Sequence, residues 1–306
     1  MKKCFAALLA CCFAIPATAQ QEFDPSEIIR DANNWLAENI DDDVLDTLGV
    51  DKTRVRKFLA DLQREFQGPY IYDLSAWRDT ARQVEPLLAK HEETQPYAAW
   101  LRTHLDDFEV AETLRKHAVT NAVDPARLPP PTTNVERSVW VQVVEKRPVP
   151  AAAAKHLVRL KEIFAEEKVP TELVWIAEVE SSFDPKARSP AGAAGMFQLM
   201  PVTAREYDLS VGLLRDERLN PEKSARVAAK LLRKLYLKFG DWRLAFAAYN
   251  AGEGRVGELL KKHKTRSFDV IRAYLPSETQ LYVPKLEATL RKREGVTLAQ
   301  MKMPGR

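Results

Sequence analysis

Apolar residues recur at helical spacing along most of the chain. The clearest case runs from Asp51 to Gln67, where an apolar stripe repeats every three or four residues and Gly68 follows as a helix stop. No stretch alternates apolar and polar residues as a half-buried strand does. The spacing predicts helices at 75–90, 97–117, 151–167, 171–182, 201–207, 221–239, 241–251, 253–262 and 278–293. The sequence therefore predicts an all-α protein.

Capping residues support these boundaries. Asp24-Pro25-Ser26-Glu27 combines an N-cap, a proline and a capping-box acid, so helices should begin there. Further along, the predicted caps and stops are Asn220, Gly240, Asp241, Gly252 and a capping box of Ser277 with Gln280.

Prolines divide the helices into two groups. Asp124-Pro125 and Pro129-Pro130-Pro131 cannot continue a helix and predict a stiff, extended linker. The predicted organisation is a signal peptide at 1–19, a helical accessory domain at 20–123, a Pro-rich linker at 124–144, a second helical domain at 145–295 and a tail at 296–306.

The first nineteen residues have the pattern of an export signal. Lys2 and Lys3 precede the apolar run 4–15, and Ala17-Thr18-Ala19 is a small-residue cleavage site. We expect export to the periplasm, with the mature chain starting at Gln20. Lipoprotein processing at Cys11 is the alternative, and it would associate the protein with a membrane.

All three cysteines lie in this leader: Cys4, Cys11 and Cys12. Cleavage after Ala19 leaves no thiol, which excludes disulfides, cysteine nucleophiles and cysteine metal sites from the mature chain. The histidines, His91, His104, His117, His156 and His263, form no HExxH pattern. We therefore expect no metal and no cofactor.

The two halves of the chain differ in charge. Residues 20–150 hold 16 Lys and Arg against 24 Asp and Glu, a net −8, whereas residues 151–306 hold 28 against 19, a net +9. Either the C-terminal half binds an anionic partner or the two halves attract each other. Nucleic acid is not expected, because the basic run 261–264 has no interleaved aromatic residues.

Two glutamates stand close together in the predicted helix 171–182. With Leu173 set at zero on a helical wheel, Glu180 falls at about 340°, within the apolar stripe, whereas Glu178 falls at about 140°. Apolar surroundings and the negative helix end should both raise the pKa of Glu180, as a general acid requires. A buried glutamate held by a structural arginine is the alternative. Glu178 is predicted to be a solvated or salt-bridged surface residue.

Two later stretches carry polar residues suited to a cleft. In SPAGAAGMFQLMP, at 189–201, two glycines permit close backbone approach to a ligand, and Gln198 can bind sugar hydroxyls or amides. Met196, Phe197, Leu199 and Met200 could line a cleft. AAYNAG, at 247–252, places Tyr249 and Asn250 at a helix end.

Glu180-Ser181-x-Phe183, SPAGAAGMFQLMP, AAYNAG and Glu278-Thr279-Gln280-Leu281-Tyr282-Val283 together resemble the catalytic domain of lytic transglycosylases of the soluble and membrane-bound type D kinds, which are related to g-type lysozymes. The resemblance covers about 145–293 and implies a lysozyme-like helical fold. Phe197 departs from the family's frequent methionine at that place, which touches the cleft wall and not the acid.

The resemblance implies an enzyme that cleaves the β-1,4 bond between N-acetylmuramic acid and N-acetylglucosamine in peptidoglycan and leaves a 1,6-anhydro end. Glu180 would act first as acid and then as base. The resemblance also implies that Ser189 and Tyr249 orient the acetamido group or Glu180, that Gln198, Met200 and Asn250 contact substrate, and that Glu278 and Tyr282 form the far wall.

Two other functions are open. A lysozyme-like hydrolase would use water in place of the sugar hydroxyl, and a cell-wall-binding scaffold would keep the fold without catalysis. The predicted partner in each case is the peptidoglycan glycan strand. For the N-terminal helices three roles are open: binding a cell-envelope protein, regulating access, or extending the substrate groove.

Overall fold

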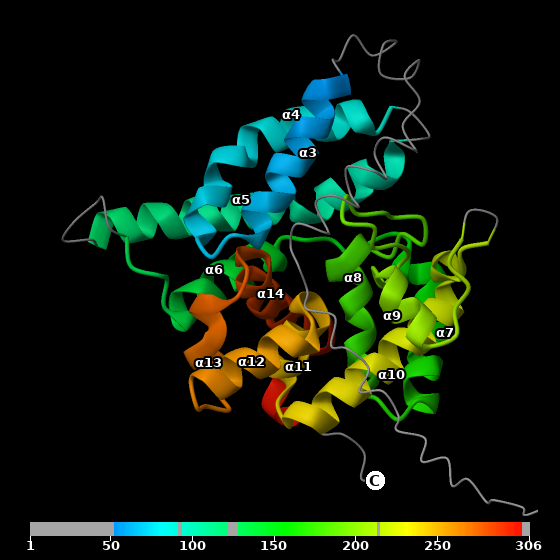
Figure 1. The fold of residues 1–306 in the computed structure, drawn as a ribbon. Coiled ribbons are helices and arrows are strands. Elements are labelled where there is room, and N and C mark those ends of the chain that lie inside the picture. The colour runs from blue at the N-terminus through cyan, green and yellow to red at the C-terminus, as the bar shows by residue number, and fades with distance from the viewer. Residues whose placement is uncertain (1–51, 91–93, 122–127, 213–214, 302–306) are drawn as a thin grey trace, which may run out of the picture.

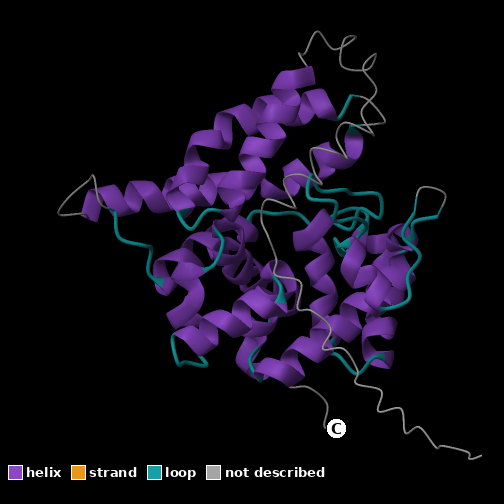
Figure 2. Ribbon diagram, viewed as in Figure 1, coloured by secondary structure: helices purple, strands orange, loops and turns teal. Residues whose placement is uncertain are grey.

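A computed structural model of the protein describes residues 52–90, 94–121, 128–212 and 215–301, without the side chains of 52–56 and 121. This part is built from helices and contains only three isolated β-bridges and no strand (Figure 2). The prediction of an all-α protein is confirmed for it. The export signal and the cap at Asp24 lie outside the described residues.

The N-terminal helices form one group (Figure 1). They are α3 (Lys52–Gln67), the 3₁₀ helix η1 (Ile71–Trp77), α4 (Arg78–Leu88) and α5 (Gln95–Asn121). The stripe predicted for α3 is buried at Phe58, Leu59, Leu62 and Phe66, where it packs against α5 residues such as Trp100 and Phe108. The helix ends at Gly68 as expected, since the Gly68 N–H donates to the carbonyls of Arg64 and Glu65.

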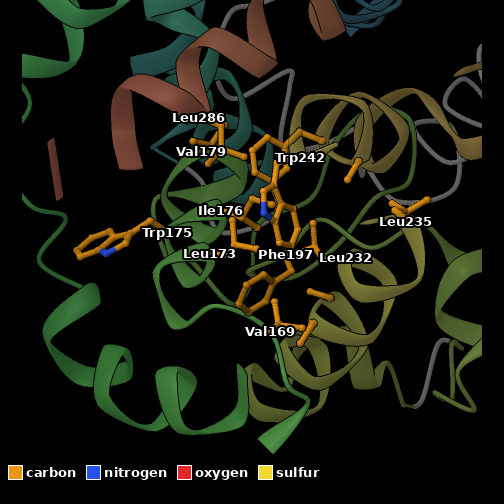
Figure 3. Close-up of a cluster of buried hydrophobic side chains, with 14 of the residues drawn as sticks. Val169, Leu173, Trp175, Ile176, Val179, Phe197, Leu232, Leu235, Trp242 and Leu286 are labelled. Atoms are coloured by element: carbon orange, nitrogen blue, oxygen red, sulfur yellow. The ribbon is translucent and has the colours of Figure 1, made fainter. Parts of the chain in front are cut away.

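The C-terminal helices enclose a second core. In order they are α7 (Ala153–Glu166), η2 (Thr171–Trp175), α8 (Ile176–Ser181), α9 (Pro201–Glu206), η3 (Glu217–Leu219), α10 (Pro221–Phe239), α11 (Trp242–Ala251), α12 (Glu253–Lys262), α13 (Phe268–Ile271), η4 (Arg272–Tyr274), α14 (Ser277–Glu294) and η5 (Leu298–Gln300). Buried side chains such as Ile176, Phe197 and Leu232 meet between them (Figure 3).

Several predicted caps have the expected geometry. The Asn220 side chain accepts from the N–H groups of Glu222 and Lys223, and the Asp241 side chain accepts from that of Leu244. Gly240 ends α10 with φ 71°, a left-handed conformation that glycine adopts without steric cost.

The predicted extended linker is wrong for residues 133–144, which lie in the helix α6 (Thr133–Glu145). Thr132 caps it, and Val139, Trp140 and Val144 are buried. The prolines end before Thr132, so they do not oppose a helix whose apolar face packs on α14. The domain boundaries themselves stay a prediction.

The predicted tail also packs on the core as far as it is described. The Trp242 indole N–H donates to the Met301 carbonyl at 2.8 Å, and Met301 is buried.

Helix α14 joins the two groups of helices. Its Leu281 and Ala288 belong to the N-terminal core, whereas Tyr282 and Leu286 belong to the C-terminal core. The predicted capping box of Ser277 with Gln280 is wrong.

The polar side chains at the start of α14 instead bind the end of α3. The Ser277 hydroxyl lies 2.9 and 3.1 Å from the carbonyl oxygens of Glu65 and Phe66, and the Gln280 amide donates to the Pro69 carbonyl at 2.9 Å. These bonds satisfy carbonyls that have no partner within α3.

Ion pairs cross the same boundary with the polarity expected from the charge difference. Those with the acid in residues 20–150 and the base in 151–306 include Lys285–Asp107 at 3.0 Å, Arg272–Glu136 at 2.8 Å and Lys292–Glu145 at 2.9 Å. Part of the charge difference between the two halves is therefore explained by ion pairs that attract the halves to each other. Within the described ranges, no helix has both the length and the apolar character needed to cross a membrane.

Candidate active site

A cavity between α8, α11, α14, the 189–200 loop and the N-terminal helices brings together Glu180 and the seven residues predicted to bind substrate or orient it. It has an empty volume of about 900 Å³, open mouth included. The predicted residues in its lining are Glu180, Ser189, Gln198, Met200, Tyr249, Asn250, Glu278 and Tyr282. They come from four separate stretches of sequence, so the fold has assembled them.

Glu180 sits one residue before the end of α8. Ser182 and Phe183 both have left-handed backbones, with φ 53° and 63°, and the N–H of Phe183 donates to the Ala177 carbonyl at 3.0 Å. Phe183 is fully buried, edge-on to Trp175. The Ser181 hydroxyl donates to the Met196 carbonyl at 2.8 Å and ties the helix end to the loop. These contacts fix where Glu180 points.

The surroundings of Glu180 favour its protonated form. Burial is the main reason that its pKa is raised to about 8, and the negative charge of Glu278 raises the pKa further. The hydrogen bond from Tyr282 and the positive charge of Lys285 both lower the pKa. The Tyr282 hydroxyl donates to Oε1 at 2.6 Å. Among the described residues no group bonds Oε2, so that oxygen is free to donate a proton to a ligand.

Glu178 has a different environment. It is 3% exposed, so the prediction of a surface position is wrong, although the predicted salt bridge is present. Arg293 Nε and Nη2 each lie 2.8 Å from one of its two carboxylate oxygens. The helical wheel placed Glu178 away from the stripe of α8, but α14 covers that side as well.

The 189–200 loop is held by its own hydrogen bonds. The Ser189 hydroxyl accepts from the Ala193 N–H at 3.0 Å. The Gln198 amide donates to the carbonyls of Ala187 and Gly195 at 3.1 and 2.8 Å. At Gly195 a Cβ would stand 1.9 Å from the Arg218 carbonyl oxygen, so only glycine fits this position.

Of the four apolar residues expected to line the cleft, only Met200 does so. Met196, Phe197 and Leu199 are buried in the C-terminal core, with the ring of Phe197 5.8 Å from that of Phe164. The departure at Phe197 therefore lies in the core and not in the cleft wall.

Helix α11 contributes two polar side chains. The Tyr249 hydroxyl donates to the Phe197 carbonyl at 2.7 Å, and burial raises its pKa well above the usual value, so it stays neutral. The Asn250 amide donates to Glu278 at 3.2 Å, and its carbonyl accepts from Thr279 at 2.6 Å. Glu278 is thus a second carboxylate fixed in the same cavity as Glu180.

Sequence reasoning found no chemistry in the N-terminal helices, yet they supply one side of the cavity. We call this side the N-terminal wall; it consists of Gln63 and Gln67 from α3 and Trp100, His104 and Asp107 from α5. The sequence did contain a signal, because the spacing of these residues places them on one face of each helix. Gln63 and Gln67 are spaced i, i+4 in α3, and Trp100, His104 and Asp107 are spaced i, i+4, i+7 in α5. Nothing in the sequence showed that these faces meet the SPAGAAG loop.

In the described ranges no three His, Cys, Asp or Glu side chains are grouped as metal ligands would be. The acids of the cavity have protein partners instead: Asp107 pairs with Lys285, and Glu278 accepts from Asn250. The expectation of no cofactor stays a prediction.

Comparison with known proteins points to one family. Residues 161–271 match the transglycosylase SLT domain. The chain is 45% identical over 123 residues to membrane-bound lytic murein transglycosylase D of Escherichia coli, which covers 39% of this chain and 27% of that protein. It is 37% identical over 121 residues to soluble lytic murein transglycosylase of Salmonella typhimurium, covering 37% and 19%. The matches thus span less than a third of these relatives.

Among solved structures, the 70 kDa soluble lytic transglycosylase of Escherichia coli aligns with 92% of this chain and 53% of its own, with 20% sequence identity and a TM-score of 0.42. The sequence matches are the stronger finding. They include Glu180 and the 189–200 loop, and the domain match ends before Glu278. Residues 161–271 are therefore similar to the transglycosylase SLT domain, and the resemblance to lytic transglycosylases is confirmed for this part of the chain.

Proposed function

We propose that this protein is a peptidoglycan lytic transglycosylase that cleaves the β-1,4 bond between N-acetylmuramic acid and N-acetylglucosamine and forms a 1,6-anhydro end. The observation that carries the proposal is the state of Glu180. Burial raises its pKa to about 8, which favours the protonated form at pH 7, and its side chain lines a cavity formed in part by the residues that match the SLT domain.

In the first step Glu180 acts as the general acid. Oε1 is occupied by the Tyr282 hydroxyl, so the proton goes from Oε2 to the glycosidic oxygen while the bond from that oxygen to C1 breaks. The carbonyl oxygen of the muramic acid's own acetamido group bonds to C1. Tyr282 then stabilises the carboxylate left on Glu180, because the same hydrogen bond lowers its pKa.

In the second step Glu180 acts as the base. Its carboxylate takes the proton of the C6 hydroxyl, O6 bonds to C1, and the acetamido oxygen leaves. This returns Glu180 to its protonated state, which burial favours. No second carboxylate is used in this sequence, and Asp107 is held by Lys285 at 3.0 Å.

The remaining cavity residues bind and orient in this proposal. Ser189 and Tyr249 orient the acetamido group or Glu180, and the hydrogen bond of Tyr249 to the loop carbonyl of Phe197 holds its ring in place. Gln198, Met200 and Asn250 contact the sugar, and Glu278 with Tyr282 forms the far wall.

One observation favours a second candidate, a lysozyme-like hydrolase. Glu278 lies in the same cavity as Glu180, and paired carboxylates are the usual equipment of glycoside hydrolases. Glu278 would then activate a water that attacks C1 in place of O6. We rank this reading second because the sequence matches are to transglycosylases by name.

Digestion of purified cell-wall sacculi, followed by mass spectrometry of the products, tests the proposal. Anhydro ends, lighter by one water than reducing ends, are the expected products, and Glu180→Gln should release none. Reducing ends would establish the hydrolase. Binding of sacculi by the unaltered protein without cleavage would establish a scaffold.

Substrate and location go together in this proposal. Peptidoglycan strands are the partner, and they are reached after export directed by residues 1–19. A cell-envelope protein bound to the N-terminal helices stays a prediction.

A further inference from the structure

The N-terminal wall lies outside the matched domain but faces the same cavity as Glu180. Two of its side chains have hydrogen-bond partners within the protein. Asp107 is paired with Lys285, whose ammonium lies 3.0 and 3.1 Å from its two carboxylate oxygens. His104 Nδ1 lies 2.9 Å from the Trp100 carbonyl, which can only accept, so Nδ1 carries a hydrogen.

Gln63 has no such partner among the described residues. Its residue is 5% exposed, it lines the cavity, and its carboxamide makes no hydrogen bond within the described ranges. Buried side-chain amides normally have partners, because desolvating one without them is unfavourable. Because Gln63 lines the open cavity, its amide is available to a ligand there.

The backbone that carries Gln63 is firmly placed. The last turn of α3 is bonded to α14 through the Ser277 N–H, which donates to the Gly68 carbonyl at 2.7 Å, and through the Ser277 hydroxyl. One turn after Gln63, Phe66 is fully buried, its ring 4.9 Å from that of His104. The wall is thus a fixed surface on which one unpaired amide faces the cavity.

A second unpaired amide atom lies in the same lining. Gln198 Oε1 is buried without a partner among the described residues, although Nε2 of the same amide donates two hydrogen bonds. The donor and acceptor of the Gln63 amide on the N-terminal wall, with the acceptor left open on the SPAGAAG loop, suit a ligand that has both kinds of group.

We propose that Gln63 is a specificity-determining residue that binds a secondary amide of the substrate. A carboxamide offers one acceptor and an N–H donor side by side, which complement the N–H and the C=O of a secondary amide. Glycan strands carry this group in two places, the acetamido groups of the sugars and the peptide bonds of the stems. The inference rests on the proposed function, and it makes the N-terminal helices part of the substrate site.

Kinetics on two substrates test the inference: strands that keep their stem peptides and strands from which an amidase has removed them. Gln63→Ala should raise KM about tenfold, the loss of one hydrogen bond in a buried site, and leave kcat unchanged. A higher KM on both substrates assigns the acetamido group, whereas a higher KM only on peptide-bearing strands assigns the stem. The matched control is Gln83→Ala, an exposed glutamine of α4 outside the cavity. An unchanged KM on both substrates would overturn the inference.

A stability measurement separates binding from fold support. Gln63→Met keeps the length of the side chain and removes the unpaired amide, so its Tm should equal or exceed that of the unaltered protein. A lower Tm with unchanged KM would show that Gln63 supports the fold instead.

The two proposals can fail separately. If the unaltered protein cleaves neither substrate, the proposed function is wrong. Calorimetric Kd values of the unaltered protein and of Gln63→Ala for peptide-bearing strands then still decide the inference, since amide recognition predicts a Kd about tenfold weaker in the variant.

Discussion

The two sides of helix α8 each bury a glutamate, and they use it in opposite ways. On the side that faces the end of α14, both oxygens of Glu178 are bound by Arg293. On the cavity side, Glu180 has one oxygen bonded by a neutral tyrosine and one oxygen open. Burial is common to both, so burial alone does not produce an acid. The difference lies in the partner: the Arg293 guanidinium occupies both oxygens of Glu178, whereas the Tyr282 hydroxyl leaves one oxygen of Glu180 open to the cavity.

Replacing each glutamate with glutamine breaks this comparison most strongly. Glu180→Gln should lower the rate of sacculus digestion by about 1000-fold or more, because it removes both the acid and the base, and should leave the fold intact. Glu178→Gln should preserve the rate of the folded protein and lower its stability. The digestion rate is measured for each variant, and thermal melts followed by circular dichroism measure its stability. Equal losses of rate in the two variants would contradict the contrast between Glu178 and Glu180.

Removing the arginine sharpens the structural half of the comparison. Arg293→Met leaves Glu178 buried without a cation and should cost about 3–5 kcal/mol in the free energy of unfolding. Urea denaturation measures it. The double variant Glu178→Met with Arg293→Met should recover much of this loss, since it leaves no unpaired charge. A single variant as stable as the unaltered protein would show that the pair has no structural role.

The smallest expected effect comes from the hydroxyl on the cavity side. Tyr282→Phe removes the hydrogen bond that lowers the pKa of Glu180, so the alkaline limb of the pH–rate profile should move to higher pH. The maximal rate should fall about tenfold, because the carboxylate formed after proton transfer loses its donor. Tyr274→Phe, at an exposed tyrosine outside the cavity, is the control. A limb that moves to lower pH would contradict the assignment.

Local patterns predicted most of the helices, whereas the role of Glu180 as the acid stays a prediction. Leu173 and Glu180 share a stripe whose burial follows from helical spacing, and Asn220 and Asp241 cap because capping depends on the next three residues alone. The motifs at 189–201 and 247–252 also brought the right residues to the cavity.

Contacts between distant segments could not be read in the same way. Ser277 and Gln280 have the spacing of a capping box, but they bond instead to carbonyls at the end of α3 and just after it. Glu178 is buried because α14 covers its side of α8. Gln63 belongs to the cavity only because α3 docks beside α14, which no pattern within 52–67 specifies.

The protonation of Glu180 is the claim on which the catalytic account depends. Carbon-13 NMR of protein labelled at the glutamate side-chain carboxyl, with Glu180→Gln to assign the signal, measures it directly. The account predicts a carboxyl that stays protonated at pH 7 and titrates with a midpoint near the pKa of about 8. A signal already ionised at pH 6, with a midpoint close to that of an ordinary glutamate, would contradict it.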